Sequence, residues 1–371
     1  MSVDECGCSM SRVLFLCDIE LADAKRGTPI HVARLLTELR REHDMIVCAA
    51  SVPEALQDVF VPYPQEKGMG KLRALLRIVD QYKPKTVFTI GQVGLMGPIL
   101  LKLFRGVRIV TELQGVEYIE KYAMGHIGLL ESYVWKYKSM LLLPFYDVVI
   151  AFTRRTASLY PFLRKIAIIF PGIDLETLPQ ATCRAIPPLV VGYSGNTDAY
   201  QGLTHIIEAV ALVRKKGIDV RLHLVLSGTD AKVRPTLDLI EAQGLTSVTT
   251  ILRNLSHKES ITEMLTASVL PIPRTRALES VYGFPSKLPE SLALGVPVIT
   301  TNVGAVPELM PDLGNHATVI PAEGITQNLA DALMRVAHMS IEEREVRGAA
   351  AREYAKRFSW ERATQIASET L

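Results

Sequence analysis

The sequence predicts an α/β fold made of two doubly wound, Rossmann-like domains. Short apolar runs alternate with helical periods from one end of the chain to the other. These runs are continuously apolar, which is typical of parallel strands covered on both faces. A proline-rich, irregular stretch interrupts the alternation near the middle. With 371 residues, of which 48% are hydrophobic and 22% charged, the chain has enough apolar material for two cores.

The first half of the chain predicts six buried strands and two clear helices. The helices cover Ile30–Arg41, with Val32, Leu35, Leu36 and Leu39 on one face, and Gly70–Tyr82. The expected strands are Val13–Cys17, Met45–Ala49, Thr86–Ile90, Val107–Thr111, Val148–Phe152 and Ile166–Phe170.

A linker and a second series of strands follow. Pro171-Gly172-Ile173-Asp174 breaks the pattern, and Pro179, Pro187 and Pro188 come soon after. The last segment, Ser340–Leu371, is helical with a break near Phe358–Trp360. The predicted domains are therefore 1–172 together with 358–371, and 173–357, facing a central cleft. The strands expected in the second domain are Leu189–Tyr193, Arg221–Leu226, Val248–Leu252, Val269–Ile272, Val298–Thr301 and Thr318–Ile320.

Charge and cysteine content limit the class of protein. A net charge of +2 argues against nucleic acid as a partner. The five cysteines form an odd set, and Cys17 and Cys48 lie in apolar runs, which predicts reduced thiols in a cytoplasmic protein. Cys6-Gly-Cys8 has no second pair of ligands, so no metal site is expected there. The remaining cysteine is Cys183.

Two features concern membranes. Residues 1–11 are polar and contain acids, so we expect no signal peptide. The longest apolar run, Met140–Phe152, is broken by Pro144 and Asp147 and is too short to span a bilayer. The preceding Tyr133–Lys138 mixes aromatic residues with lysines, which allows contact with a membrane surface, but a helix packed in the core is the favoured interpretation.

The stretch Phe284–Thr301 carries the strongest local signal for a ligand. Ser286 can cap a helix that Gly295 ends, with Leu288, Leu292 and Ala293 facing inward. Lys287 beside the free amides of a helix start favours an anion, and Glu290 can accept two hydroxyl hydrogen bonds. A phosphate and a diol together describe a nucleotide. The alternative is an ordinary helix–strand unit in which both charges are solvated.

Two loops could also contact phosphate. The first, Asp18–Pro29, ends with Gly27, which allows close approach of a ligand, and with Thr28 as a cap before His31 in the first helical turn. The alternative is a capped surface helix with an exposed histidine. The second, Ser194–Gly202, holds two glycines between a strand and a helix, which suits phosphate binding by backbone amides or simply a tight turn.

A third loop imitates a dinucleotide fingerprint. Gly91, Gly94 and Gly97 follow a strand, and Glu112 ends the next strand. Their spacing is GxxGxxG instead of GxGxxG, and the loop is not in the first strand–helix unit, so a nicotinamide site is disfavoured. The chain has no GxSxG elbow, HExxH motif, P-loop or paired CxxC.

Taken together, the motifs resemble those of the family 4 glycosyltransferases, which are retaining enzymes of GT-B fold that use nucleotide sugars. The resemblance covers nearly all of the chain, and the final Phe358-Ser359-Trp360 is similar to the helix that crosses back onto the first domain in that fold. The motifs that carry it are Gly27-Thr28 with His31, Phe170–Asp174, Tyr193–Asn196 with Tyr200-Gln201-Gly202, Glu290–Pro297, and Gly304 with Pro307-Glu308.

The resemblance implies a donor site in the second domain and an acceptor site in the first. Glu290 would hold the ribose diol, the loop Phe284–Leu288, including Ser286, would give amides to the donor, and Gly27 and Gly195 would lie near the diphosphate. No metal and no cofactor are implied, because helix dipoles and cations neutralise the leaving diphosphate. The expected partners are a nucleoside-diphosphate sugar and a carbohydrate or lipid-linked acceptor. A cytoplasmic location, with peripheral contact at the inner face of the cell membrane, would follow.

Three departures from the family pattern affect the assignment of roles. Tyr282 stands where the family has an acid that contacts the donor sugar. Asn196 and Gln201 replace an Arg and a Lys near the diphosphate, and Lys287 and Arg274 are the candidate replacements. Where the first domain of the family has a His, this chain has Gln114. Gln114 or His31 is therefore expected near the transferred sugar, with no general base, as suits a front-face transfer assisted by the leaving phosphate.

Three alternatives to a glycosyltransferase remain open. An epimerase or phosphorylase-like enzyme would use the same fold for another reaction. A non-catalytic nucleotide-binding subunit of a transferase would explain the missing cations. The third alternative is the nicotinamide enzyme of the GxxGxxG loop.

Overall fold

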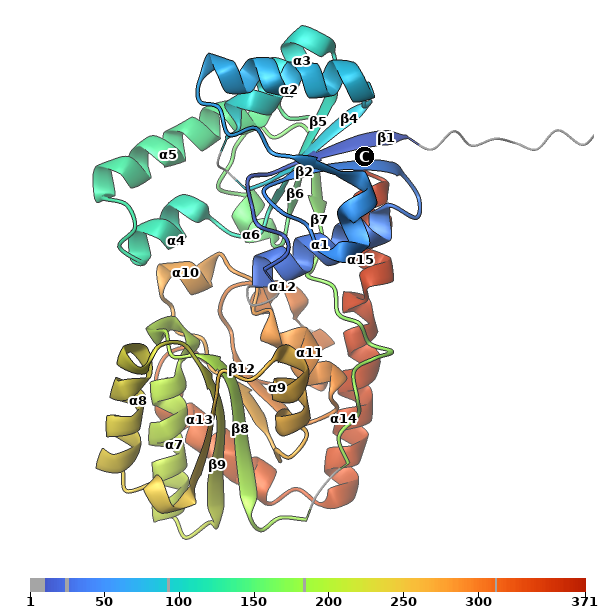
Figure 1. Ribbon diagram of the computed structural model, residues 1–371. Coiled ribbons are helices and arrows are strands. Elements are labelled where there is room, and N and C mark those ends of the chain that lie inside the picture. The colour runs from blue at the N-terminus through green and yellow to red at the C-terminus, as the bar shows by residue number, and fades with distance from the viewer. Residues whose placement is uncertain (1–10, 24–26, 92–93, 183–184, 311) are drawn as a thin grey trace, which may run out of the picture. The chain divides into compact units, whose positions relative to one another are not determined.

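The computed structural model describes residues 11–23, 27–91, 94–182, 185–310 and 312–371. Two compact units make up the chain, one formed by the residues up to Gly172 with Trp360–Leu371 and the other by Ile173–Ser359. Each unit is a parallel sheet between helices, as Figure 1 shows. The prediction of an α/β fold with two doubly wound domains is confirmed.

The first unit contains a seven-stranded parallel sheet in the order β3-β2-β1-β4-β5-β6-β7. The chain builds outward from β1 to β3 and then restarts on the other side of β1, so the topological switch point lies between β1 and β4. The predicted strands formed with end shifts of a few residues, whereas β3 was not predicted. The strands are β1 (Arg12–Leu16), β2 (Asp44–Ala49), β3 (Phe60–Pro62), β4 (Thr86–Ile90), β5 (Arg108–Leu113), β6 (Val148–Ala151) and β7 (Ile166–Ile168).

Helices cover both faces of this sheet (Figure 1). The described ones are α1 (Gly27–Leu39), α2 (Met69–Tyr82), α3 (Met96–Arg105), α4 (Glu117–Ala123), α5 (Leu129–Leu142), α6 (Arg154–Ala157) and α15 (Trp360–Ser368), with short 3-10 helices at Glu54–Val59 and Leu143–Phe145. The C-terminal α15 belongs to the first unit and packs on α1, as the fold predicted from the resemblance requires.

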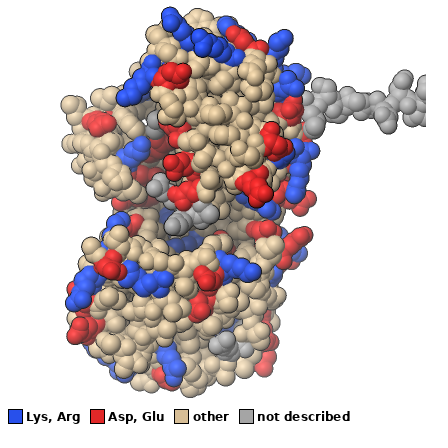
Figure 2. All heavy atoms as spheres, in the orientation of Figure 1, with Lys and Arg blue, Asp and Glu red and all other residues tan. Residues whose placement is uncertain are grey.

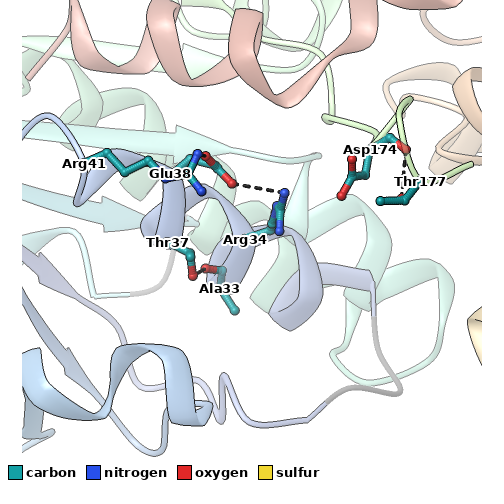
Figure 3. A network of polar contacts seen from close by, with 7 residues as sticks. All are labelled: Ala33, Arg34, Thr37, Glu38, Arg41, Asp174 and Thr177. Atoms are coloured by element: carbon teal, nitrogen blue, oxygen red, sulfur yellow. Dashed lines mark hydrogen bonds and ion pairs between the residues drawn. The ribbon is translucent and has the colours of Figure 1, made fainter.

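Helix α1 buries one face and presents a charged one. Val32, Leu35, Leu36 and Leu39 are all buried, as predicted. The buried Glu38 pairs with two more exposed arginines, Arg34 one turn before it, at 3.1 Å, and Arg41 (Figure 3). In the second unit, the same figure shows Thr177 donating to the carbonyl of Asp174 at 3.1 Å, in the turn that follows the linker glycine.

The second unit contains two three-stranded parallel sheets joined by a bridge. Their orders are β10-β9-β8 and β11-β12-β13, and a bridge between Val191 and Val269 puts β8 beside β11. The switch point of this unit therefore lies between β8 and β11. The strands are β8 (Leu189–Asn196), β9 (Val220–Ser227), β10 (Thr249–Arg253), β11 (Leu270–Ile272), β12 (Val298–Thr301) and β13 (Thr318–Ile320).

The helices of the second unit enclose an aliphatic core. Leu203, Ile206, Ile207, Val210 and Val213 line the buried face of α7, as predicted. The described helices are α7 (Leu203–Lys215), α8 (Asp230–Ala242), α9 (His257–Met264), α10 (Leu278–Val281), α11 (Lys287–Ala293), α12 (Val306–Leu309), α13 (Ile325–Ala337) and α14 (Ile341–Ala355), with 3-10 helices at Ala199–Gln201, Thr246–Val248, Asp312–Asn315 and Lys356–Phe358.

Some predictions of local structure are wrong. Ser194, Gly195 and Asn196 continue β8 instead of opening a loop, because β9 pairs with β8 along its whole length. The helix after Gly128 does not pack in the core, since Tyr133 and Tyr137 are 49% and 57% exposed. No helix in the part of the chain that the structure describes combines the length and apolar character needed to span a bilayer.

Two of the five cysteines are described, and both are free and buried. They are Cys17, which follows β1, and Cys48 in β2. The predicted thiol state of these two is therefore confirmed, while Cys6, Cys8 and Cys183 lie outside the described residues.

Candidate functional site

A cavity of about 190 Å³ opens at the switch point of the second unit. It lies at the carboxyl ends of β8 and β11, which is where open parallel sheets bind ligands. Its polar lining comes from Lys287, Glu290 and His257, and its apolar lining from residues such as Met264 and Ile272. The predicted Lys287 and Glu290 are thus brought to one site.

Lys287 reaches from α11 to the end of β8. Its ammonium donates to the hydroxyl of Tyr193 at 3.2 Å and to Oε1 of Gln201 at 3.2 Å, and lies 4.5 Å from the centre of the Tyr193 ring. Gly195 has a φ of +149°, and a Cβ there would overlap Nζ of Lys287. Glycine at this position therefore lets the ammonium pass against the strand.

Burial lowers the pKa of Lys287 to about 7, and the nearby Arg274 adds to the effect. Glu290 and Asp198 act in the opposite direction. The site therefore holds a cation that lacks a full counter-charge. An anion bound beside it would favour the protonated form and raise this pKa.

Glu290 lies on α11, one turn after Ser286, and engages a histidine. Its Oε1 is 2.8 Å from Nε2 of His257, which begins α9. This hydrogen bond raises the pKa of His257. The pairing fixes one carboxylate oxygen at the rim of the cavity, and a carboxylate has the capacity to accept further hydrogen bonds through the other.

The start of α11 differs from the prediction. Ser286 has helical backbone angles and its hydroxyl caps no amide, so the predicted capping role is wrong. The Ser286 side chain is exposed instead. Leu288 is fully buried and fixes the orientation of the helix, and Gly295, with a φ of +71°, ends it as predicted.

The other predicted donor-site residues lie around the end of β8. Asn196 is the last residue of that strand, where its carbonyl accepts from the Tyr193 hydroxyl at 2.5 Å and its side chain accepts from the amide of Asp198 at 3.3 Å. Gln201 is buried. Arg274, two residues after β11, places its guanidinium 5.4 Å from the centre of the Tyr200 ring. A tyrosine ring thus lies beside each of the two cations, Lys287 and Arg274.

The first unit contains a hydrogen-bonded chain of four residues around the buried His31 and Glu112, with Gln114 partly buried and Thr28 exposed. Nε2 of His31 lies 3.0 Å from Oε1 of Glu112, and Nε2 of Gln114 donates to the same oxygen at 2.9 Å. Thr28 donates to Oε1 of Gln114 at 2.8 Å. The structure thus brings the predicted His31 and Gln114 together, through a carboxylate that holds both.

This geometry corrects two predictions about the start of α1. His31 is 8% exposed, so it is not a surface histidine. It packs between Phe152 and Trp360, with each ring centre 5.2 Å away. The helix begins at Gly27, so Thr28 lies within it and bonds Gln114 instead of capping. Gly27 directly follows residues outside the described part of the chain, and its place near a diphosphate stays a prediction.

Two atoms of the hydrogen-bonded chain are not satisfied by the described residues. Nδ1 of His31 and Oε2 of Glu112 are buried and have no hydrogen-bond partner there. Buried polar atoms without a partner are costly and mark places where a ligand or water completes the site.

A second cavity, of about 470 Å³, lies at the switch point of the first unit. It is formed where β1 and β4 end, between α2 and the start of α3, and apolar side chains supply most of its walls. Lys71, whose ammonium lies 4.4 Å from the centre of the Tyr63 ring, and Asp18 are its charged residues. Burial raises the pKa of the Cys17 thiol in this wall to about 12, so the thiol is neutral.

Sequence reasoning missed Glu112 and His257 as site residues. Glu112 has a visible signal, because it is a carboxylate within the apolar run Ile109–Leu113 of a buried strand. The sequence pattern relates Glu112 only to the GxxGxxG loop, in which residues 92 and 93 lie outside the described part of the chain. His257 lies 33 residues before Glu290 with no motif between them, so only the fold brings the two together.

Metal binding has little support in the described residues. No group of three or more His, Cys, Asp or Glu side chains gathers there as a metal site would require.

Comparison with known proteins identifies a matching family. Residues 180–354, most of the second unit, match the family model described as glycosyl transferases group 1. The second unit of the chain therefore matches this family. The matched residues include every predicted donor-site residue of the second unit, from Gly195 to Glu290.

The curated relatives that match this chain are glycosyltransferases by name. A D-inositol 3-phosphate glycosyltransferase of Saccharomonospora viridis is 29% identical over 211 residues, which are 53% of this chain and 47% of the relative. The chain thus spans about half the length of that relative. An O-antigen biosynthesis glycosyltransferase, WclY of Escherichia coli, is 23% identical over 321 residues, 80% of this chain and 84% of the relative.

Solved structures share the fold over the whole chain. HepE of Anabaena, in complex with UDP, superimposes with a TM-score of 0.76 at 16% identity, covering 97% of this chain and 99% of HepE. A sucrose-phosphate synthase of Thermosynechococcus elongatus gives a TM-score of 0.72 at 14% identity, covering 97% and 98%. The GT-B fold predicted from the sequence is confirmed.

Proposed function

We propose that this protein transfers a sugar, with retention, from a nucleoside-diphosphate sugar bound by its second unit to an acceptor bound by its first. The observation that carries the proposal is that Lys287 and Glu290 line the same cavity, at the switch point between β8 and β11. A cation and a carboxylate at this position match the diphosphate and the ribose diol of such a donor.

The donor would be held by side chains and by backbone amides. Lys287 binds the diphosphate, with the amides of Gly195, Ser286 and Lys287, and with Asn196, Gln201 and Arg274 around it. The amide of Leu288 already donates to the carbonyl of Pro285 at 2.8 Å. Glu290 accepts from the ribose hydroxyls while His257 keeps Oε1 of that carboxylate occupied. The presence of UDP in the HepE structure makes UDP the first nucleotide to test.

In the reaction, the bond between the anomeric carbon and the diphosphate oxygen breaks as the acceptor oxygen bonds to the same face of that carbon. The leaving phosphate oxygen takes the acceptor proton, so no protein base is needed. Lys287 offsets the negative charge that develops on the diphosphate. His31 and Gln114, aligned by Glu112, lie near the transferred sugar and bind its hydroxyls.

The acceptor would bind in the cavity at the switch point of the first unit. Its apolar walls and its two charged residues suit a carbohydrate that carries an apolar or lipid group. The relative named for O-antigen biosynthesis is consistent with a glycan acceptor. We therefore propose a carbohydrate or lipid-linked carbohydrate acceptor, met at the surface of a membrane.

A thermal-shift titration tests the donor site. Wild type and Glu290→Ala would be titrated with UDP, GDP, ADP, CMP and NAD. The control is Glu345→Ala, which changes an exposed residue of α14. A ligand at 100 times its dissociation constant stabilises the fold by about 2.7 kcal/mol. We expect a shift with one diphosphate in wild type and in the control, and an affinity at least about tenfold weaker in Glu290→Ala.

Measurements of turnover then distinguish a transferase from the alternative functions. Release of the nucleotide that requires an acceptor supports the proposal, whereas turnover of the nucleotide sugar alone would indicate an epimerase or phosphorylase-like enzyme. The replacement of two expected cations by Asn196 and Gln201 favours a second candidate, a non-catalytic subunit. Nucleotide binding without turnover in any acceptor mixture would establish that role, and a shift with NAD alone would overturn both.

A further inference from the structure

Helix α5 presents its large apolar side chains to solvent. Leu130, Tyr133, Val134, Tyr137 and Leu141 are 79%, 49%, 57%, 57% and 70% exposed. The small Ser132 and Ser139 are buried instead, and Ser132 donates to the carbonyl of Tyr118 at 3.1 Å. This orientation is the reverse of the usual one, in which the apolar side of a surface helix packs on the protein.

These five residues form a single stripe, which we call the α5 face. A sixth exposed apolar residue of the helix, Leu129, is 55% exposed and lies outside the stripe. The spacing of the five, by three, four and seven residues, places them on one side of the helix. At about 100° per residue, Lys136 and Lys138 lie about 100° to either side of Tyr137, so one lysine borders each edge of the stripe. Glu131 is the acid of this helix.

Exposed apolar residues continue beyond the helix. Phe145, in the 3-10 turn after α5, is 53% exposed, and Leu103 and Phe104 in α3 are 74% and 52% exposed. Lys102 donates to the carbonyl of Phe145 at 3.0 Å, which places that turn beside the end of α3. In Figure 2 the surface over α4 and α5, at the left of the first unit, is mostly uncharged, with a small acidic and a small basic area on it.

We propose that the α5 face docks on the surface of a lipid bilayer that contains anionic headgroups. A helix with an apolar stripe bordered by lysines lies in the plane of the interface, with its apolar side among the acyl chains. Tyrosines suit this depth because one end of the side chain is apolar and the other polar. Lysine stems follow the apolar boundary while their ammonium groups reach the headgroups.

The two lysines favour a bilayer over a protein partner. Lys136 lies 5.9 Å from the centre of the Tyr137 ring, so its stem already follows the stripe. Lysine is depleted at protein–protein interfaces, where its ammonium would be desolvated. At an anionic membrane the same group gains from the surface potential, by about fivefold in binding for each lysine.

This inference deepens the proposed function, on which it rests for its purpose, since docking through the first unit would bring the acceptor cavity to a membrane that holds a lipid-linked acceptor. The docking itself can be measured without any sugar transfer. Its failure is thus distinguishable from failure of the proposed activity.

Vesicle flotation with the full chain tests the proposal. Wild type would be mixed with vesicles of phosphatidylcholine alone and with vesicles containing about one third phosphatidylglycerol. We expect flotation with the anionic vesicles, at least tenfold weaker binding for Val134→Glu and for Leu141→Glu, and loss of the preference for anionic lipid in Lys136→Gln with Lys138→Gln.

The matched control is Val346→Glu, which makes the same change at a 69% exposed valine of α14 in the second unit. It should float like wild type, and all variants should unfold at the same temperature as wild type, which shows that they are folded. Wild type that stays in solution with both vesicle types would overturn the proposal. Dimers that dissociate in Val134→Glu would assign the face to a second copy of the chain instead.

Discussion

The ammonium of Lys287 occupies the space that a side chain at position 195 would need. Gly195 has a φ of +149°, and Tyr193 on the same strand receives a hydrogen bond from Lys287 at 3.2 Å. We predict that Gly195→Ala displaces the ammonium and weakens UDP binding about tenfold or more, because a charged hydrogen bond is worth about 1.5–3 kcal/mol. Isothermal titration calorimetry would measure the change.

A second glycine separates this overlap from backbone strain. Gly217 follows α7 with a φ of +86°, and a Cβ there would meet no atom within 4 Å. Gly217→Ala should therefore cost about 1 kcal/mol of folding free energy and leave UDP binding unchanged. Equal binding by Gly195→Ala and wild type would contradict the assignment of Lys287 to the diphosphate.

The pH dependence of donor binding should follow Lys287. Burial lowers its pKa to about 7 in the free protein, and a bound diphosphate favours its protonated form. Above pH 7 binding must therefore take up a proton, so the affinity should fall as pH rises, by up to about tenfold per pH unit. UDP-glucose is the suitable probe between pH 7 and 9, since its diphosphate has no group that titrates there.

Two measurements test this pH dependence. Calorimetry in buffers of different ionisation enthalpy should detect the proton uptake directly, and Lys287→Arg should bind without the pH dependence because a guanidinium stays charged. An affinity that is flat from pH 7 to 9 in wild type would remove Lys287 from the diphosphate site.

Removing the charge of Lys287 should stabilise the fold. A cation whose pKa is lower in the folded state than in the unfolded state opposes folding wherever the unfolded chain is protonated. Lys287→Met should therefore raise the free energy of unfolding by about 0.5–2 kcal/mol at pH 6 and abolish UDP binding. The gain should shrink between pH 7 and about 10.5, where wild type folds with a neutral lysine. Urea unfolding at pH 6 and pH 9 would show whether the gain has this sign.

The sequence predicted most strands and pointed to Lys287 as a candidate cation because both inferences depend on local patterns. Continuous apolar runs gave most strands, and Lys287 next to a helix start suggested an anion site. The short β3 was not predicted because its apolar run, Val59–Val61, is only three residues long and is followed at once by Pro62. Ser286 failed as a cap because helical backbone angles leave its hydroxyl directed away from the first amides.

Long-range pairs were beyond the sequence. Glu290 and His257 meet because β11 and the loops around it bring α9 and α11 to one cavity. The exposure of α5 also could not be deduced from its composition, since a helix rich in leucine and tyrosine normally packs inward. Only the burial of its serines shows which side faces the protein.

The hydrogen-bonded chain in the first unit leads to the last prediction. Glu112 holds both His31 and Gln114 through one oxygen, so it is a positioning residue for the two side chains expected near the transferred sugar. Glu112→Gln keeps the shape of the side chain but places an amide beside Gln114. We expect kcat to fall about 10- to 100-fold with the KM for the donor changed less than about twofold, because the nucleotide and diphosphate, which would supply most of the donor's binding, are held by the second unit.

The control for Glu112→Gln must separate positioning from folding. UDP should bind the variant as it binds wild type. Gln114→Glu, which sets two carboxylates together, should lower kcat and should lower the free energy of unfolding by about 1–3 kcal/mol. A Glu112→Gln variant that loses stability and kcat in parallel while UDP binding also falls would show that the carboxylate serves only the fold. Unchanged kcat would show that the negative charge of Glu112 is not what positions His31 and Gln114.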